Sequence, residues 1–278
     1  MTTPSSGQVE SLTGRTAIVT GAARGIGDAH CRALVGRGAR VIVADVLDGE
    51  GETLAAELGE LAVFVHLDVV DRDQWTQCIG RAVSFGGGVD VLVNNAGINV
   101  PSQIEDMHPK TWDEVIAVNL TGHFNGIQAV VPEMRRAGGG SIINTASITA
   151  VVPPSQLAPY VASKMAIVGL TRVAALELGR YGIRVNALQP GYTDTPMMAG
   201  GDESAITGAM PIRRYGRPDE VADMMIYLVT HATYTTGSVL PVDGGAVAGV
   251  GYAVAEPVEQ HPTRTGTGAR AQQERTTT

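Results

Sequence analysis

Short apolar runs alternate with amphipathic helical patterns along most of the chain. Thr16 to Thr20 is the first such run, and it is typical of a strand buried on both faces. Further predicted strands are 39–45, 61–68, 90–97, 141–147, 183–189 and 238–243. The predicted helices between them are about 48–58, 71–84, 111–136, 157–179 and 218–230. This alternation predicts βαβ units and an α/β fold, with a doubly wound parallel sheet in a single domain.

The ends of the chain lack this pattern. Residues 1–13 are polar, and we expect a flexible N-terminal tail followed by one domain over 14–250. Residues 251–278 carry almost no large apolar side chains, so they cannot offset the entropy of ordering, and we expect a disordered tail. Within the domain, the segment at about 192–217 is rich in Gly, Pro, Thr and Met, which predicts a mobile lid.

Charge and composition exclude several classes of partner. The net charge of −8 over 278 residues provides no basic field for nucleic acid or for an anionic membrane. The N-terminus lacks the pattern of a signal peptide, and no run approaches the roughly 20 apolar residues of a membrane span, so we expect a cytoplasmic protein. The six histidines show no metal-ligand spacing, and we expect no metal. Cys31 and Cys78 are expected to be reduced, partly buried thiols.

The first strand runs into a glycine-rich turn, with Gly21, Gly25 and Gly27 in the order G-x-x-x-G-x-G. Arg24 and Ile26 lie within this turn, and a helical pattern follows it. Backbone without Cβ atoms can approach a pyrophosphate, while free N–H groups and the helix dipole supply positive potential. A plain tight turn is the alternative interpretation. The position between the first strand and helix of a βαβ unit favours dinucleotide binding.

Asp45 ends the second predicted strand, 24 residues after Gly21. A carboxylate there can accept hydrogen bonds from both hydroxyls of the adenosine ribose and would repel a 2′-phosphate, which predicts NAD. Arg24 favours the opposite choice, because a guanidinium can pair with the 2′-phosphate of NADP. We give the direct repulsion by Asp45 more weight. An N-cap role for Asp45 is the structural alternative.

A third group of residues could perform proton transfer. Tyr160 and Lys164 are four residues apart in a helical pattern and therefore share one face, and Ser147 ends a predicted strand. An adjacent ammonium favours the phenolate and lowers the pKa of a tyrosine from about 10. Tyr160 could then exchange a proton with a substrate oxygen that Ser147 holds. The Tyr-Lys pair alone is a weak pattern that solvated helices often show by chance.

In combination these motifs resemble the short-chain dehydrogenase/reductase family over about residues 14–246. The matching segments are Thr20 to Gly27, Asp68-Val69, Asn94-Asn95-Ala96-Gly97, Asn119, Ser147, Tyr160, Lys164, Pro190-Gly191 with Thr193 and Thr195, and Asp243-Gly244-Gly245. The resemblance implies a Rossmann-type fold and a catalytic tetrad of Asn119, Ser147, Tyr160 and Lys164. Tyr160 would be the acid/base and Ser147 would orient the substrate. Lys164 would lower the pKa of Tyr160 and bind the nicotinamide ribose. Asn119 would interrupt its helix and support a proton relay.

The resemblance also implies which residues bind the cofactor and how the chain assembles. The cofactor would contact Gly21, Arg24, Gly25, Ile26, Gly27, Asp45, Asp68, Val69, Asn95, Ala96, Gly97, Tyr160, Lys164, Pro190, Gly191, Thr193 and Thr195. Candidate neighbours of the substrate are Asn99, Thr149, Pro153, Gln156, Tyr192, Met197 and Met198. Members usually assemble as dimers or tetramers, and we expect a homo-tetramer, with a dimer as the alternative.

The sequence leaves three candidate functions. The favoured one is an NAD-dependent oxidoreductase acting on a secondary alcohol or ketone of a small organic substrate. An NADPH-dependent ketoreductase of the 3-oxoacyl or polyketide type is the alternative, which Arg24 permits and Asp45 opposes. The third is a dinucleotide-binding regulator without turnover, which the complete tetrad argues against. Neither substrate identity nor stereochemistry follows from the fold.

Overall fold

A seven-stranded parallel sheet with the strand order β3-β2-β1-β4-β5-β6-β7 forms the centre of the computed structural model, which describes residues 11–208 and 210–249. The strands are β1 (Thr16–Thr20), β2 (Arg40–Asp45), β3 (Ala62–His66), β4 (Val91–Asn94), β5 (Gly140–Thr145), β6 (Ile183–Pro190) and β7 (Val239–Val242). Each strand pairs in parallel with its neighbours. The predicted fold class is therefore confirmed.

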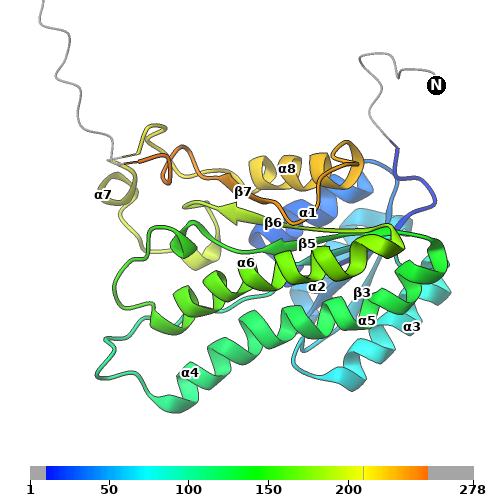
Figure 1. Cartoon of the computed structure of the whole chain (residues 1–278), viewed down its shortest axis with the longest axis horizontal. Coiled ribbons are helices and arrows are strands. Elements are labelled where there is room, and N and C mark those ends of the chain that lie inside the picture. Colours follow the sequence, from blue (N-terminus) through cyan, green and yellow to red (C-terminus); the bar gives the residue numbers. More distant parts are fainter. Residues whose placement is uncertain (1–10, 209, 250–278) are drawn as a thin grey trace, which may run out of the picture.

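Helices cover both faces of this sheet (Figure 1). The α-helices are α1 (Gly25–Val35), α2 (Asp48–Leu58), α3 (Arg72–Gly86), α4 (Pro109–Ile116), α5 (Gly122–Ala137), α6 (Ala158–Leu178), α7 (Glu203–Thr207) and α8 (Pro218–Thr230). Short 3-10 turns occur at η1 (Gly59–Leu61), η3 (Ile148–Ala150), η4 (Gly179–Tyr181) and η5 (Pro196–Met198), and η2 (Ala117–Thr121) is a π-helical turn. Helices α1, α2 and α8 pack on one face, and α3, α5 and α6 pack on the other.

The alternation of side chains along the strands supplies both halves of the core. Ile18 is aligned with Ile42 and Leu92, and all three face α3, α5 and α6. The next residue on β1, Val19, faces α1 and α8 with its neighbours. Because both faces are covered, the strands are apolar at successive positions, which explains the continuous apolar runs of the sequence.

The strand order reverses between β1 and β4, and this reversal positions the site. β2 and β3 lie to one side of β1, whereas β4 to β7 lie to the other. In open α/β sheets, ligands bind at the carboxyl ends of the strands where the order reverses. The glycine turn after Thr20 and the turn after Asn94 leave the sheet at this point, so they face one another.

Two features differ from the sequence-based expectations. The ordered fold begins before residue 14: Leu12 is buried, and its N–H donates to Arg37 O over 2.8 Å. The helix expected over 111–136 is present as α4, η2 and α5, which follow one another without a gap, but η2 adds a π-helical turn within it. The remainder of the expected N-terminal tail and the expected tail at 251–278 lie outside the described residues. The segment 192–217 contains η5 and α7, apart from residue 209.

Other expectations concern thiols, metals and membranes. Cys31 and Cys78 are free and fully buried, more so than expected, and burial raises the pKa of both thiols. Among residues 11–208 and 210–249, His, Cys, Asp and Glu side chains form no group of three that could hold a metal ion. In the same part of the chain, no helix is long and apolar enough to cross a membrane.

Candidate active site

The glycine turn and the turn after β4 form one braced unit. The Thr20 hydroxyl accepts hydrogen bonds from the backbone N–H groups of Asn95 (3.0 Å) and Ala96 (3.1 Å). The Asn95 side-chain amide donates in return to the carbonyls of Thr20 and Gly21, both at 3.1 Å. Gly21 has φ +60°, and a Cβ there would lie 2.7 Å from the Cα of Ala96. Asn95 and Ala96 therefore hold the glycine turn in shape.

The turn is open where a dinucleotide would bind. Helix α1 begins at Gly25, and the preceding residue, Arg24, makes no side-chain cap and is exposed. The first N–H groups of the helix therefore keep their donors free for an anion. A Cβ at Gly25 would lie 3.2 Å from the Cγ2 of Thr195, so the wall formed by the segment after β6 comes within reach of the turn. This cradle fits a pyrophosphate.

Asp45 is buried beside the glycine turn. One carboxylate oxygen accepts from the Ala23 N–H at 2.9 Å, and the other accepts from the Leu47 N–H at 3.1 Å. Asp45 thus holds two backbone amides, but it is not the N-cap that the sequence left open as an alternative, because Leu47 is the N-cap of α2 and no side chain caps that helix. Each carboxylate oxygen can accept a second hydrogen bond, so this role leaves acceptor capacity for a ribose.

Side chains of α3 and α5 hold the turn after β3 in place through hydrogen bonds. Asp68 accepts from the Val70 N–H at 3.0 Å. The carbonyl of Val69 accepts from the Trp75 indole at 3.0 Å and from the Asn125 side-chain amide at 3.1 Å. Asp68 and Val69 therefore lie in a rigid turn at the same edge of the sheet as Asp45.

The π-helical turn η2 places Asn119 inside the protein. The Gly122 N–H donates to Ala117 O, five residues earlier, which inserts one residue into the helix. Asn119 is fully buried, and its side-chain oxygen accepts from Ile98 N at 2.8 Å. Its amide donates to Ile98 O at 3.0 Å and to the Ser163 hydroxyl at 3.2 Å. Asn119 therefore joins the turn after β4 to helix α6.

Lys164 points from α6 toward the carboxyl end of β5. Its ammonium donates to Thr145 O at 2.7 Å, and the side chain is buried. A Cβ at Gly97 would meet both Asn119 Oδ1 at 3.4 Å and Lys164 Nζ at 3.6 Å, so these two groups lie beside the same glycine. Burial lowers the pKa of Lys164 to about 7. The lysine can therefore gain or lose a proton near neutral pH.

Tyr160 and Ser147 meet at the mouth of the site. Ser147 precedes η3, where its hydroxyl accepts from the Thr149 N–H at 3.1 Å. Burial raises the pKa of Tyr160 above its usual value, and the nearby Ser147 side chain lowers it by less. Lys164 Nζ lies 5.5 Å from the centre of the Tyr160 ring. The expectation that Lys164 would lower the pKa of Tyr160 is therefore wrong. Both side chains are buried, and desolvation is the largest influence on the pKa of each.

The segment after β6 closes the crevice from the other side. Pro190 ends β6, and the Gly191 N–H donates to Val242 O at 2.9 Å. A Cβ at Gly191 would lie 2.7 Å from the Cα of Asp243, so the glycine allows β6 and the turn after β7 to come together. Thr193 donates to Gly191 O at 3.1 Å and Thr195 donates to Thr193 O at 3.3 Å. These bonds direct the segment toward the glycine turn.

The structure adds two groups that the sequence reasoning missed. The Ser163 hydroxyl donates to Tyr160 O at 2.6 Å and accepts from Asn119, which links two members of the expected tetrad. The carbonyl of Thr145 holds Lys164. Ser163 could have been suspected from its place beside Lys164 on the helix face shared with Tyr160. A backbone carbonyl gives no signal in a sequence.

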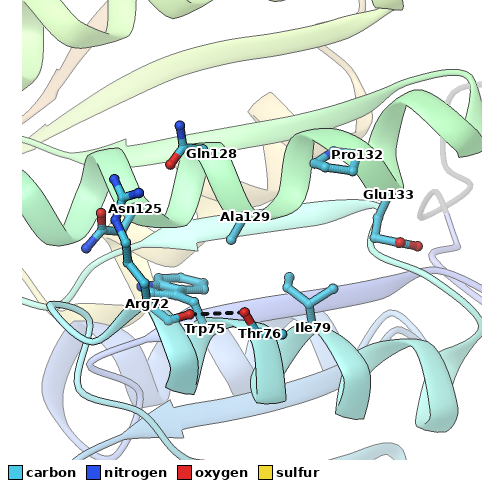
Figure 2. A pocket seen from close by; sticks show the side chains of 9 residues that line it. All are labelled: Arg72, Trp75, Thr76, Ile79, Asn125, Gln128, Ala129, Pro132 and Glu133. Carbon is cyan, nitrogen blue, oxygen red and sulfur yellow. Dashed lines mark hydrogen bonds between the residues drawn. The ribbon is translucent and has the colours of Figure 1, made fainter.

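A separate hollow of about 360 Å³ lies between α3 and α5 (Figure 2). Trp75 and Ile79 come from α3, whereas Asn125, Ala129 and Pro132 come from α5. None of the residues expected to bind cofactor or substrate lines it. The candidate active site is thus the crevice at the carboxyl ends of the strands, and this hollow is a different surface feature.

Comparisons with known proteins agree with this geometry. Residues 15–205 match the family described as short chain dehydrogenase. A 3-alpha-(or 20-beta)-hydroxysteroid dehydrogenase of Mycobacterium tuberculosis is 46% identical over 242 residues, which cover 87% of this chain and 92% of that enzyme. A trans-4-hydroxycyclohexanecarboxylate dehydrogenase of Sinomonas cyclohexanicum is 41% identical over 245 residues, covering 84% of this chain and 93% of that enzyme.

Among solved structures, the fold is similar to a 3-ketoacyl-(acyl-carrier-protein) reductase from Brucella melitensis complexed with NADH. The TM-score is 0.83 at 32% sequence identity, and the match covers 85% of this chain and 100% of the other.

Proposed function

Because the chain belongs to the short-chain dehydrogenase family and is thereby a nicotinamide-dependent oxidoreductase of alcohols and ketones, we propose that it uses NAD(H) and acts on a secondary alcohol carried by a ring. One relative is named for the 3-alpha or 20-beta hydroxyl of a steroid and another for the hydroxyl of a cyclohexanecarboxylate; the 3-alpha and 4-hydroxyl groups are on saturated rings, which supports the second part. The nicotinamide supplies the hydride acceptor or donor.

One observation carries the catalytic part of the proposal: Ser147 lies close enough to Tyr160 to influence its pKa, and the Lys164 ammonium lies 5.5 Å from the centre of the Tyr160 ring. Ser147 holds the substrate oxygen, and Tyr160 Oη exchanges a proton with it. Because burial raises the pKa of Tyr160, the protein keeps this phenol protonated, which suits proton donation to a ketone. Lys164, with a pKa of about 7, accepts or supplies the proton that Tyr160 exchanges.

The remaining site residues bind and position the cofactor in this proposal. Gly21, Arg24, Gly25, Ile26 and Gly27 bind the pyrophosphate side through backbone donors, and Asp68, Val69 and the turn Asn95-Ala96-Gly97 contact the adenosine half. Pro190, Gly191, Thr193 and Thr195 contact the nicotinamide half, with Lys164 and Tyr160 on the nicotinamide ribose. We also propose that the segment 192–217 covers the substrate as a lid.

Replacing Tyr160 tests the catalytic proposal. Tyr160→Phe removes only the hydroxyl, and we expect turnover to fall by about 10²- to 10⁴-fold, the usual loss of an acid/base group. NADH binding, followed by fluorescence titration, should stay within a few-fold of wild type. Tyr181→Phe is the matched control, because Tyr181 lies in η4 at the far end of α6. A Tyr160→Phe enzyme that turns over at the wild-type rate would contradict the proposed role.

The NAD preference rests on Asp45, whose carboxylate would lie against a 2′-phosphate. Asp45→Asn keeps one acceptor for the turn amides and removes the charge. The ratio of kcat/KM with NAD to that with NADP should therefore fall by about 10-fold or more. An unchanged ratio would remove the basis for NAD. Exposed Arg24 supports the alternative, an NADPH-dependent ketoreductase of the 3-oxoacyl or polyketide type, and Arg24→Ala should then weaken NADP binding more than NAD binding.

A further inference from the structure

Exposed apolar side chains on three segments that adjoin residues of the candidate active site form what we call the apolar rim. We define it as Ile98, Val100, Val151, Val152 and Met197, whose residues are 37%, 40%, 55%, 55% and 52% exposed. They come from three segments far apart in the sequence, after β4, after η3 and in η5. Exposed apolar side chains that gather at one place commonly mark a binding surface.

Each segment of the rim is attached to a residue of the site. Both backbone groups of Ile98 bond to the Asn119 side chain. The N–H groups of Val151 and Val152 donate to Ile148 O, directly after Ser147. Met197 follows Thr195 by two residues. The rim is therefore continuous with the place where the reacting carbon would lie.

Gln156 fixes two of these segments to each other. Within residues 11–208 and 210–249 it is the only non-glycine residue with a positive φ, at 67°. Its carbonyl accepts from the Ser102 N–H at 2.8 Å, which ties the segment after η3 to the segment after β4. A left-handed conformation is unfavourable for a side chain such as glutamine, and such strain is found preferentially at functional sites. The two sides of the rim thus have a fixed separation.

The rim residues and their immediate neighbours carry no positive charge, whereas Arg213 and Arg214 lie further along the proposed lid, where Arg214 pairs with Glu220. The segments 98–102, 148–160 and 191–198 contain no lysine, arginine or histidine, and their one ionisable acid is the exposed Asp194. Glu105 and Asp106 add negative charge further along the first segment. The nearest buried cation, Lys164, already donates to Thr145 O. A carboxylate or phosphate that entered the rim would lose water without gaining a partner.

We propose that the substrate is uncharged and apolar beyond its hydroxyl-bearing carbon, and that the rim recognises this apolar body. This inference rests on the proposed function. A ring alcohol without an acidic group would bury its hydrocarbon surface against the rim. The same alcohol with a free carboxylate, the kind of substrate for which the Sinomonas relative is named, would be disfavoured by this chain.

A matched pair of substrates isolates the effect of charge. trans-4-Hydroxycyclohexanecarboxylate and its methyl ester share one ring and one reacting carbon, and cyclohexanol serves as the reference alcohol. With NAD and the wild-type protein, we expect kcat/KM for the ester to exceed that for the acid by about 10-fold or more. Affinity measured by calorimetry on the Tyr160→Phe protein with NADH should show the same preference without turnover.

A charge placed on the rim should reverse this selectivity. Val152→Lys supplies the missing cation, so the ester-to-acid ratio should fall by about 10-fold. The ratio is taken within the same variant, so a loss of turnover common to both substrates cancels. Gln77→Lys is the control, since it adds the same charge to an exposed position on α3 and should leave the ratio unchanged.

The outcomes separate this proposal from the one on which it rests. If wild type oxidises cyclohexanol but prefers the acid, or treats acid and ester alike, the rim does not select for an uncharged substrate although the proposed function stands. If Val152→Lys leaves the ratio unchanged, the rim is not the determinant. Absence of turnover with all three alcohols, together with absence of binding by Tyr160→Phe, would overturn both proposals.

Discussion

At the scale of single residues, burial rather than pairing sets the chemistry of the ionisable groups inside the protein. Desolvation is the largest influence on the pKa values of Tyr160 and Lys164, and it opposes the charged form of each. His123, one helical turn beyond Asn119, has its pKa lowered well below the usual value, first by burial and then by the charge of Lys164. A lysine that is half protonated near neutral pH can pass protons, whereas a permanently charged one could not.

His30 gives a prediction at this scale. It is fully buried in α1, neither ring nitrogen has a partner among the described residues, and burial lowers its pKa from 6.5 to about 3. Between these values the unfolded chain binds a proton that the folded chain does not. The free energy of unfolding therefore falls as the pH drops from 6.5 toward 3. His30→Leu lacks this titration. Between pH 7.5 and pH 4.5, its free energy of unfolding should therefore rise by about 2 to 3 kcal/mol relative to that of wild type.

Urea unfolding of both proteins at several pH values measures this difference. Carboxylates titrate in the same range, but they contribute equally to both proteins and cancel in the comparison. If the difference in the free energy of unfolding between the two proteins stays constant from pH 7.5 to pH 4.5, His30 is able to ionise in the folded protein.

At the scale of elements, an interruption in a helix places the tetrad asparagine. The extra residue in η2 turns the Asn119 side chain inward, where it bonds Ile98 and Ser163. Ser163 in turn contacts the carbonyl of Tyr160. The π-helical turn therefore connects the turn after β4 with the first turns of α6.

Asn119→Leu should test this connection. The substitution leaves the Ile98 N–H and C=O without partners and removes the bond to Ser163, so we expect the free energy of unfolding to fall by about 2 to 4 kcal/mol. Ser163→Ala removes only the bonds of one hydroxyl and should cost about 1 kcal/mol. Chemical denaturation compares the two. Equal losses would mean that Asn119 does not stabilise the turn at Ile98.

The sequence predicted the sheet well because its strands are buried on both faces and appear as continuous apolar runs. Thr16–Thr20 and Ile183–Pro190 were located from such runs. The apolar pattern did not predict the π-helical turn, because one added residue barely changes a helical pattern. The interruption at Asn119 was implied only by the family resemblance. The left-handed Gln156 was also missed, since positive φ values are expected of glycine or asparagine.

The site shows a similar division between what sequence can and cannot supply. The glycine turn, Asp45 and the Tyr160–Lys164 pair were identified from spacing, because a strand end or a helix face fixes where those side chains lie. The pKa of Tyr160 could not be predicted from the neighbouring lysine alone, since desolvation depends on how the whole crevice closes. The bracing role of Asn95 likewise requires the position of Thr20 on another strand.

At the scale of the whole molecule, several exposed apolar side chains outside the rim fall on two further sets of elements, which we call patch A and patch B. Patch A lies on α4, α5 and α6 and consists of Trp112, Phe124, Met165, Val173 and Leu176, with Leu176 85% exposed. Patch B lies around α8 and the approach to β7 and consists of Ile212, Tyr227 and Tyr234, of which Tyr234 is fully exposed. Helices α5 and α8 cover opposite faces of the sheet (Figure 1). Two distinct self-complementary patches generate a tetramer, whereas one generates a dimer.

We therefore propose a homo-tetramer and predict how it divides. Leu176→Glu places a charge in patch A, and Tyr234→Glu places one in patch B. Because burying an unpaired carboxylate is costly, each variant should form a dimer through the patch that remains, and the double variant should be a monomer. Light scattering after size-exclusion chromatography gives the masses, with Thr53→Glu on exposed α2 as a tetrameric control. A wild-type monomer, or a Tyr234→Glu protein that remains tetrameric, would contradict the assignment of two interfaces to these patches.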